Sequence, residues 1–158
     1  GLAFLSLVSP GPSLPAWQPG AGGLITLAAG AGGLAAAALG LKRAQARLAA
    51  GGGAGLLSGL ALAANLVALL VLAAFVLLQA PDPTRHAADA VRMAILAYVG
   101  LHIALSLLFS AFALDLGRRG ELAPGRAGAL RNAGLWQSYT LATALVSMAA
   151  LWAQAGAP

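Results

Sequence analysis

Four long stretches of this sequence carry almost no charge, and they constrain the fold more than any other feature does. They cover residues 23–41, 56–79, 89–114 and 134–154. A helix rises about 1.5 Å per residue, so roughly 20 apolar residues cross the hydrocarbon core of a bilayer, which is about 30 Å thick. The sequence therefore predicts an all-α fold, in which residues 23–158 form an integral membrane bundle of four transmembrane helices.

The composition supports a membrane location. Of the 158 residues, 60% are hydrophobic and only 8% are charged, whereas soluble domains average about 45–50% and about 25%. We attribute the net charge of +5 to basic loops at a membrane surface. The sequence has no basic face interleaved with aromatic residues, so nucleic acid is not expected as a partner. The chain lacks cysteine, which excludes disulfides, iron–sulfur clusters and thiolate metal sites.

The first 22 residues differ from the rest of the chain. Four prolines and Trp17 lie between residues 9 and 22, and proline removes backbone donors and fixes φ. Residues 1–22 are therefore expected to form an irregular arm, with Trp17 at the membrane interface. The chain begins with Gly rather than Met, which indicates processing or a longer parent polypeptide. Residues 1–10 are interpreted as a short interfacial arm or as the end of a preceding, fifth helix.

The distribution of Lys and Arg predicts an orientation in the membrane. Seven basic residues follow the first and third apolar segments, and two lie between the second segment and the start of the third. The seven are Lys42, Arg43, Arg47, Arg118, Arg119, Arg126 and Arg131, and the two are Arg85 and Arg92. We expect the seven to occupy two loops, the first of which continues into a flexible hinge at Gly51–Gly53. Because basic loops remain in the cytoplasm, both termini are predicted to lie outside.

Two features predict contacts between the helices. Glycines in the first segment recur seven residues apart, as Gly23–Gly30 and Gly33–Gly40. Such spacing allows close approach of another helix, unless it only reflects a Gly- and Ala-rich composition. Asn65 is the only strongly polar residue inside the second segment. Its amide needs a partner in hydrocarbon, so it either faces another helix or bonds to its own backbone or to water.

The sequence offers little that could carry out a reaction. It contains no P-loop, GxSxG, HExxH or CxxC motif. Its two histidines, His86 and His102, are sixteen residues apart, about 24 Å along a helix, so they cannot bind one haem or one metal together. Catalytic, cofactor-binding and metal-binding residues are therefore not expected. Tyr98 and His102 share a helix face as an i,i+4 pair, either as a packing contact or as a polar patch for a lipid headgroup or a subunit.

Three stretches in the second half of the chain resemble a known family. They are His86-Ala-Ala-Asp-Ala-Val91, Leu96-Ala-Tyr-Val-Gly-Leu-His102 and Asn132-Ala-Gly-Leu-Trp-Gln-Ser-Tyr-Thr140. They resemble subunit III of haem-copper cytochrome c oxidases, above all the subunit III-like portion fused behind subunit I in some bacteria. The chain departs from that pattern at Ala88, where an aromatic residue is common, and at Ser138, where His is usual. The intramembrane Glu of full-length subunit III also has no counterpart.

The resemblance implies an accessory subunit of a respiratory terminal oxidase in the bacterial plasma (inner) membrane. Such a subunit packs on catalytic subunit I in a complex with subunit II and binds phospholipid. It holds no cofactor, because haem and copper reside in the partner subunits, and it is a non-catalytic component of a proton-translocating enzyme. The candidate lipid or subunit contacts are Tyr98, His102, Asn65, Asn132, Trp136 and Tyr139. Trp136 and Tyr139 at one end of the last segment, with Trp152 at the other, also predict an aromatic belt at each membrane surface.

Two other functions stay open at this point. One is the membrane anchor of a quinone-linked respiratory dehydrogenase, which needs a haem or quinone site with His102 as the leading ligand. The other is a small transporter, for which an ionisable group inside a span is the usual sign. His102 is the only such group in the predicted spans.

Overall fold

The chain folds into four long helices and contains no strand in the described part. The computed structural model describes residues 21–79, 81–82, 84 and 87–155. Its elements are α2 (Ala21–Ala49), α3 (Gly55–Gln79), α4 (Ala87–Arg118), the short 3-10 helix η1 (Pro124–Arg126) and α5 (Gly128–Ala155). The predicted all-α class is therefore confirmed. Of the predicted N-terminal arm, only Ala21 and Gly22 are described, as the start of α2; Trp17 lies outside the described residues, and so does His86.

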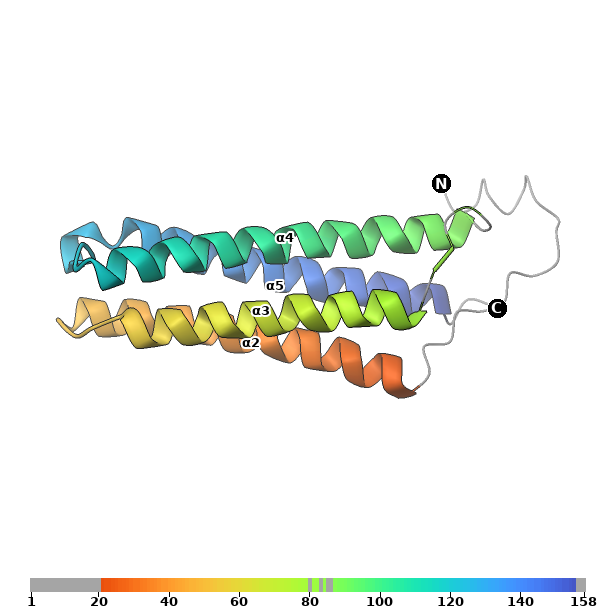
Figure 1. Cartoon of the computed structure of the whole chain (residues 1–158), viewed down its shortest axis with the longest axis horizontal. Coiled ribbons are helices and arrows are strands. Elements are labelled where there is room, and N and C mark those ends of the chain that lie inside the picture. The colour runs from red at the N-terminus through yellow and green to blue at the C-terminus, as the bar shows by residue number, and fades with distance from the viewer. Residues whose placement is uncertain (1–20, 80, 83, 85–86, 156–158) are drawn as a thin grey trace.

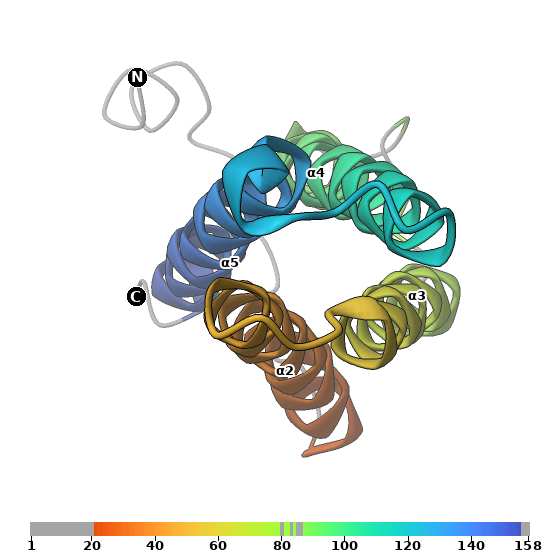
Figure 2. The ribbon, with the colours of Figure 1, turned by 90° about the vertical axis from the view of Figure 1, so that its left-hand side faces the viewer.

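The four helices stand side by side and form a ring. Figure 1 shows them antiparallel to their neighbours, and Figure 2 shows the order α2, α3, α4, α5 around the ring. Each helix packs on the next one, and α5 closes the ring against α2. Short connections favour such antiparallel neighbours in helical bundles. Towards its N-terminal end, α2 leans away from the other helices (Figures 1 and 2).

Three helices are longer than the predicted apolar segments, and this corrects the placement of the basic residues. Lys42, Arg43 and Arg47 lie in the last two turns of α2 rather than in a loop. Arg118 ends α4, and Arg131 lies in the first turns of α5. A helix satisfies its backbone internally, so it need not end where the apolar side chains end. Basic side chains also interact favourably with the C-terminal end of a helix dipole, as in α2 and α4.

Glycine caps end α2 and α4, and the first two residues of the predicted hinge, Gly51 and Gly52, form the cap of α2. Gly51 and Gly120 have φ values of 78° and 71°, a region that glycine adopts without steric cost. The Gly51 N–H donates to Leu48 O at 3.0 Å, and the Gly52 N–H donates to Arg47 O at 2.8 Å. This pair of bonds is a Schellman cap, which satisfies the last carbonyls of the helix.

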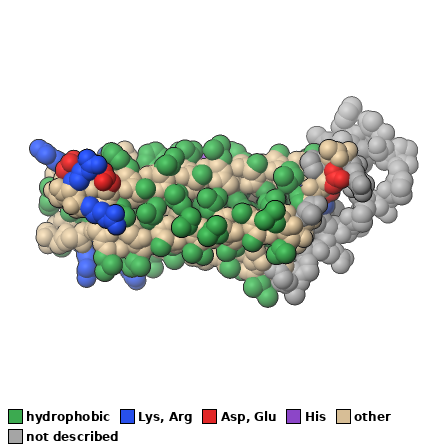
Figure 3. Space-filling view, viewed as in Figure 1, with side chains coloured by type: hydrophobic (Ala, Val, Ile, Leu, Met, Phe, Trp, Pro, Cys, Tyr) green, Lys and Arg blue, Asp and Glu red, His purple; other side chains and the backbone are tan. Residues whose placement is uncertain are grey.

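The charges gather at the two ends of the bundle and leave a wide apolar band between them (Figure 3). Among the described residues, Asp82, Asp89 and Arg92 lie at one end, and all other charged residues lie at the opposite end, which we call the basic end. Asp89 lies in the first turn of α4, and its carboxylate accepts from Arg92 Nη1 at 2.6 Å. Three helices, α2, α3 and α4, are long and apolar enough to cross a membrane. The protein therefore has the character of a membrane protein.

The close approach predicted from the glycines is found between α2 and α3. A Cβ atom placed on Gly33 would lie 3.2 Å from Ala64 O, and one on Gly40 would lie 3.4 Å from Leu57 O. Between these two glycines, Ala37 is fully buried. Small side chains let the two backbones pack directly on each other, which stabilises helix pairs in membranes through van der Waals contact.

Candidate functional site

A chain of hydrogen bonds in the bundle interior links all four helices. The Asn65 amide on α3 donates from Nδ2 to Ser110 Oγ on α4 at 3.2 Å and to Gln137 Oε1 on α5 at 3.0 Å. Gln137 in turn donates from Nε2 to the carbonyl oxygen of Leu34 on α2 at 3.2 Å. The side chains of Asn65, Ser110 and Gln137 are fully buried. The prediction that Asn65 faces another helix is confirmed.

A second buried pair continues this polar layer between α4 and α5. Ser106 Oγ and Thr140 Oγ1 are 2.8 Å apart, and Thr140 Oγ1 also donates to His102 O at 3.4 Å. These groups are amides and hydroxyls, which do not ionise near neutral pH. Across the described residues, no group of three His, Cys, Asp or Glu side chains could hold a metal ion. The buried polar side chains join one helix to another.

An aromatic cluster covers the outer side of the α4–α5 contact. His102 lies parallel to Trp136, with ring centroids 5.7 Å apart and an interplanar angle of 1°. Tyr98 and Tyr139 approach the same imidazole at 4.2 Å and 5.4 Å. Because a carbonyl oxygen only accepts, His102 Nδ1 carries the proton that it donates to Tyr98 O at 2.8 Å. The predicted contact between Tyr98 and His102 is confirmed, and the ring of Phe109 packs against Trp136, with ring centroids 5.7 Å apart.

This cluster corrects the predicted belt at one end of the last helix. Trp136 and Tyr139 pack against His102, which lies thirteen residues from Asp89 and thirteen from Asp115 along α4. Their rings therefore reach towards the middle of the apolar band instead of marking its edge. The reason is that ring stacking on α4 directs the two side chains, whereas sequence position alone suggested the membrane surface.

Two phenol hydroxyls of the cluster face outward. The side chains of Tyr98 and Tyr139 are 47% and 50% exposed, and their hydroxyl oxygens are 3.3 Å apart. A shallow hollow begins at Tyr139 and runs towards the basic end along Phe109, Leu135 and Trp136. Asn132 lines it and is exposed near that end.

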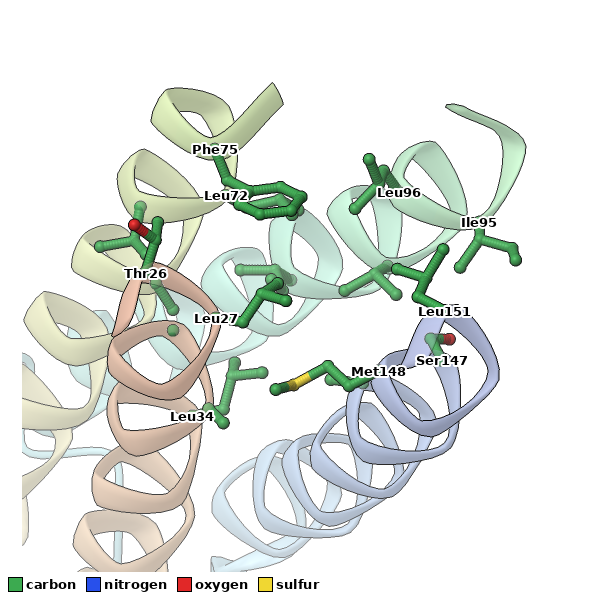
Figure 4. A pocket seen from close by; sticks show the side chains of 17 residues that line it. Thr26, Leu27, Leu34, Leu72, Phe75, Ile95, Leu96, Ser147, Met148 and Leu151 are labelled. Carbon is green, nitrogen blue, oxygen red and sulfur yellow. The ribbon is translucent and has the colours of Figure 1, made fainter. Parts of the chain in front are cut away.

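An apolar cleft opens at the other end of the bundle, where α2 leans away (Figure 4). Leu27 and Leu34 of α2 face Met148 and Leu151 of α5 across it, and Phe75 closes it from α3. The free space within it, measured for a group the size of water, is about 40 Å³. Only two lining residues, Thr26 and Ser147, carry polar side chains. Such a lining favours an apolar group over a polar one.

The predicted site residues thus separate into three places. Tyr98, His102, Trp136 and Tyr139 meet in the aromatic cluster, Asn65 lies in the interior, and Asn132 lies near the basic end. Gln137 and the cleft were not predicted from the sequence. For Gln137 a signal existed, because it lies three residues from Thr140 and shares a helix face with it. For the cleft no signal existed, because it depends on the lean of α2.

Comparison of the chain with models of protein families, with curated proteins and with solved structures finds no match. The function is therefore inferred from the residues and their geometry alone.

Proposed function

We propose that this protein is a cofactor-free accessory subunit of a respiratory terminal oxidase, of the subunit III type. In this proposal it packs on the haem-copper catalytic subunit and holds a phospholipid by one acyl chain. The observation that carries the proposal is the apolar cleft between α2 and α5. The resemblance to subunit III of Leu96–His102 and Asn132–Thr140 supplies the context.

The cleft favours an acyl chain over a polar solute. A transported solute needs polar groups that replace its hydration, and the cleft has only Thr26 and Ser147 to offer. A hydrocarbon chain needs contact area, which Leu27, Met148 and Leu151 provide. Burial of a methylene group contributes about 0.8 kcal/mol. Several buried methylene groups would therefore keep the lipid bound during detergent extraction.

In the proposed orientation, α5 is the fourth crossing and the basic end is cytoplasmic. α5 is less apolar than the other helices, but its buried polar groups, Gln137 and Thr140, face the interior and not lipid. The basic end carries nine of the twelve described charged residues, seven of them Lys or Arg, as the positive-inside rule favours.

The orientation predicts a labelling pattern that the cysteine-free chain makes simple to read. In intact cells or right-side-out vesicles, a membrane-impermeant maleimide should label Thr84→Cys. It should label Gly53→Cys and Glu121→Cys only after the membrane is permeabilised. All three positions are exposed. Leu66→Cys, on the lipid-facing side of α3, serves as the control and should stay unlabelled in both conditions. The reverse pattern at the first three positions would contradict the orientation.

The functional proposal predicts the components of the intact complex. Native mass spectrometry after mild extraction should show this chain with a haem-copper subunit and one bound phospholipid. Ser147→Phe, which fills the cleft from α5, should lose that lipid. Ala150→Phe adds the same ring one turn further on an exposed face and should keep it. A complex without a haem-copper subunit would reject the oxidase assignment, and lipid retention in Ser147→Phe would reject the cleft.

A further inference from the structure

The hydroxyl pair of Tyr98 and Tyr139 contains a donor that the chain itself does not use. Each phenol has one O–H donor, and the two oxygens share a single hydrogen bond at 3.3 Å. When one phenol donates to the other, the proton of the second phenol has no acceptor among the described residues. Both side chains are about half exposed, so this donor is available at the surface.

The depth of this O–H group in the membrane limits which groups can accept a hydrogen bond from it. Tyr98 lies six residues from Arg92 on α4, and Tyr139 lies eight residues from Arg131 on α5. These separations are about 9 Å and about 12 Å along the helices. The donor thus lies well inside the apolar band, below the ester oxygens of lipids at the interface. Hydrocarbon tails offer no acceptor, and an unpaired donor there is costly.

The surface around the pair is shaped for protein contact. His102 and Trp136 lie behind the phenols and restrict their movement, while Leu101 and Leu135 flank them and are exposed. The hollow that begins at Tyr139 could receive a side chain of a packed helix. Tyrosine and tryptophan are enriched where proteins bind one another. By contrast, the large exposed residues of α3 are all aliphatic: Leu56, Leu60, Leu66, Val67, Leu70, Leu77 and Leu78.

We propose that this face of α4 and α5 docks on one transmembrane helix of the catalytic subunit. That helix presents an acceptor oxygen in the middle of the membrane, from an amide or hydroxyl side chain or from a backbone carbonyl freed at a kink. The oxygen accepts from the second phenol of the Tyr98–Tyr139 pair. The inference rests on the proposed function, since that function supplies the partner, and it adds the surface and the chemistry of the contact.

Removing the hydroxyls tests the hydrogen bond. We expect Tyr98→Phe and Tyr139→Phe to have small effects singly, because the remaining phenol can still donate to the partner. The double variant should weaken association with the catalytic subunit in liposomes roughly threefold to thirtyfold, the range that one interhelical hydrogen bond provides. Energy transfer between labelled subunits measures the affinity. Unchanged unfolding in SDS verifies that the double variant is folded, and unchanged affinity would overturn the proposal.

Crosslinking in the native membrane tests the face itself. A photoreactive phenylalanine analogue replaces Leu101 or Leu135 beside the pair, or Val67 on α3 as the control. We expect Leu101 and Leu135 to capture a peptide from a transmembrane helix of the catalytic subunit, and Val67 to capture lipid. The docking face would be contradicted, and the proposed function would stand, if Val67 captures the catalytic subunit while Leu101 and Leu135 capture only lipid or a quinone. If no position captures a haem-copper subunit, both fail.

Discussion

Replacement of Gly33 by leucine is expected to lower the free energy of unfolding of the bundle by about 1–3 kcal/mol. A Cβ atom at this position would lie 3.2 Å from Ala64 O and 3.4 Å from Ala68 Cβ. Both are fixed parts of α3, so neither can turn aside to make room. The larger side chain would push α2 away from α3 and break the close backbone contact at this position.

Gly32 provides the matched control for this experiment. It precedes Gly33 on the same helix, and a Cβ atom there would meet nothing within 4 Å. Gly32→Leu should therefore leave stability within about 0.5 kcal/mol of the wild type. SDS titration of the purified protein in mixed micelles, followed by circular dichroism, measures both variants. Equal loss of stability in the two variants would show that the loss at Gly33 does not come from the close approach of α2 and α3.

Loss of the Gln137 amide is the second large effect that we expect. Gln137→Leu keeps the size of the side chain but removes the bonds to Asn65 Nδ2 and to Leu34 O. Hydrogen bonds between membrane helices contribute about 0.6 kcal/mol on average and up to about 1.7 kcal/mol. We therefore expect a loss of about 1–3 kcal/mol in the same SDS titration, because two bonds disappear together.

A neighbouring control and a double-mutant cycle isolate that effect. Ser138 donates only to Gly134 O within its own helix, so Ser138→Ala should change stability by less than about 0.5 kcal/mol. If Asn65 and Gln137 stabilise the fold through their mutual hydrogen bond, the double variant Asn65→Leu/Gln137→Leu should lose less free energy of unfolding than the sum of the losses in the two single variants. Strict additivity would mean that the two amides act independently.

Local pattern was enough to predict several contacts of the site. The i,i+4 spacing of Tyr98 and His102 places both on one face of any helix, and their rings lie 4.2 Å apart. An isolated amide in an apolar segment needs a partner, and Asn65 has two. These inferences succeeded because they depend on helix geometry and on the cost of an unpaired polar group, which hold in every bundle.

Other features could not be predicted because they depend on which helix faces which. Trp136 suggested an aromatic belt, and only its parallel stacking on His102 places its ring away from the edge of the apolar band. The partner of Asn65 could have been any polar group on three other helices. The ends of α2 and α4 were also missed, because charged residues after an apolar segment suggest a loop, whereas a helix continues wherever its backbone stays bonded.

The amino-acid sequence by itself determined the apolar helices, the charge at their ends and the absence of cysteine. These follow from transfer energies and helix periodicity, which are properties of single segments. Only the tertiary structure decided that Gln137 joins Asn65 to Leu34, that α2 leans away to open a cleft, and that the phenols of Tyr98 and Tyr139 meet at the surface. Each of these depends on the rotation and tilt of one helix against another, and pairwise packing sets those quantities.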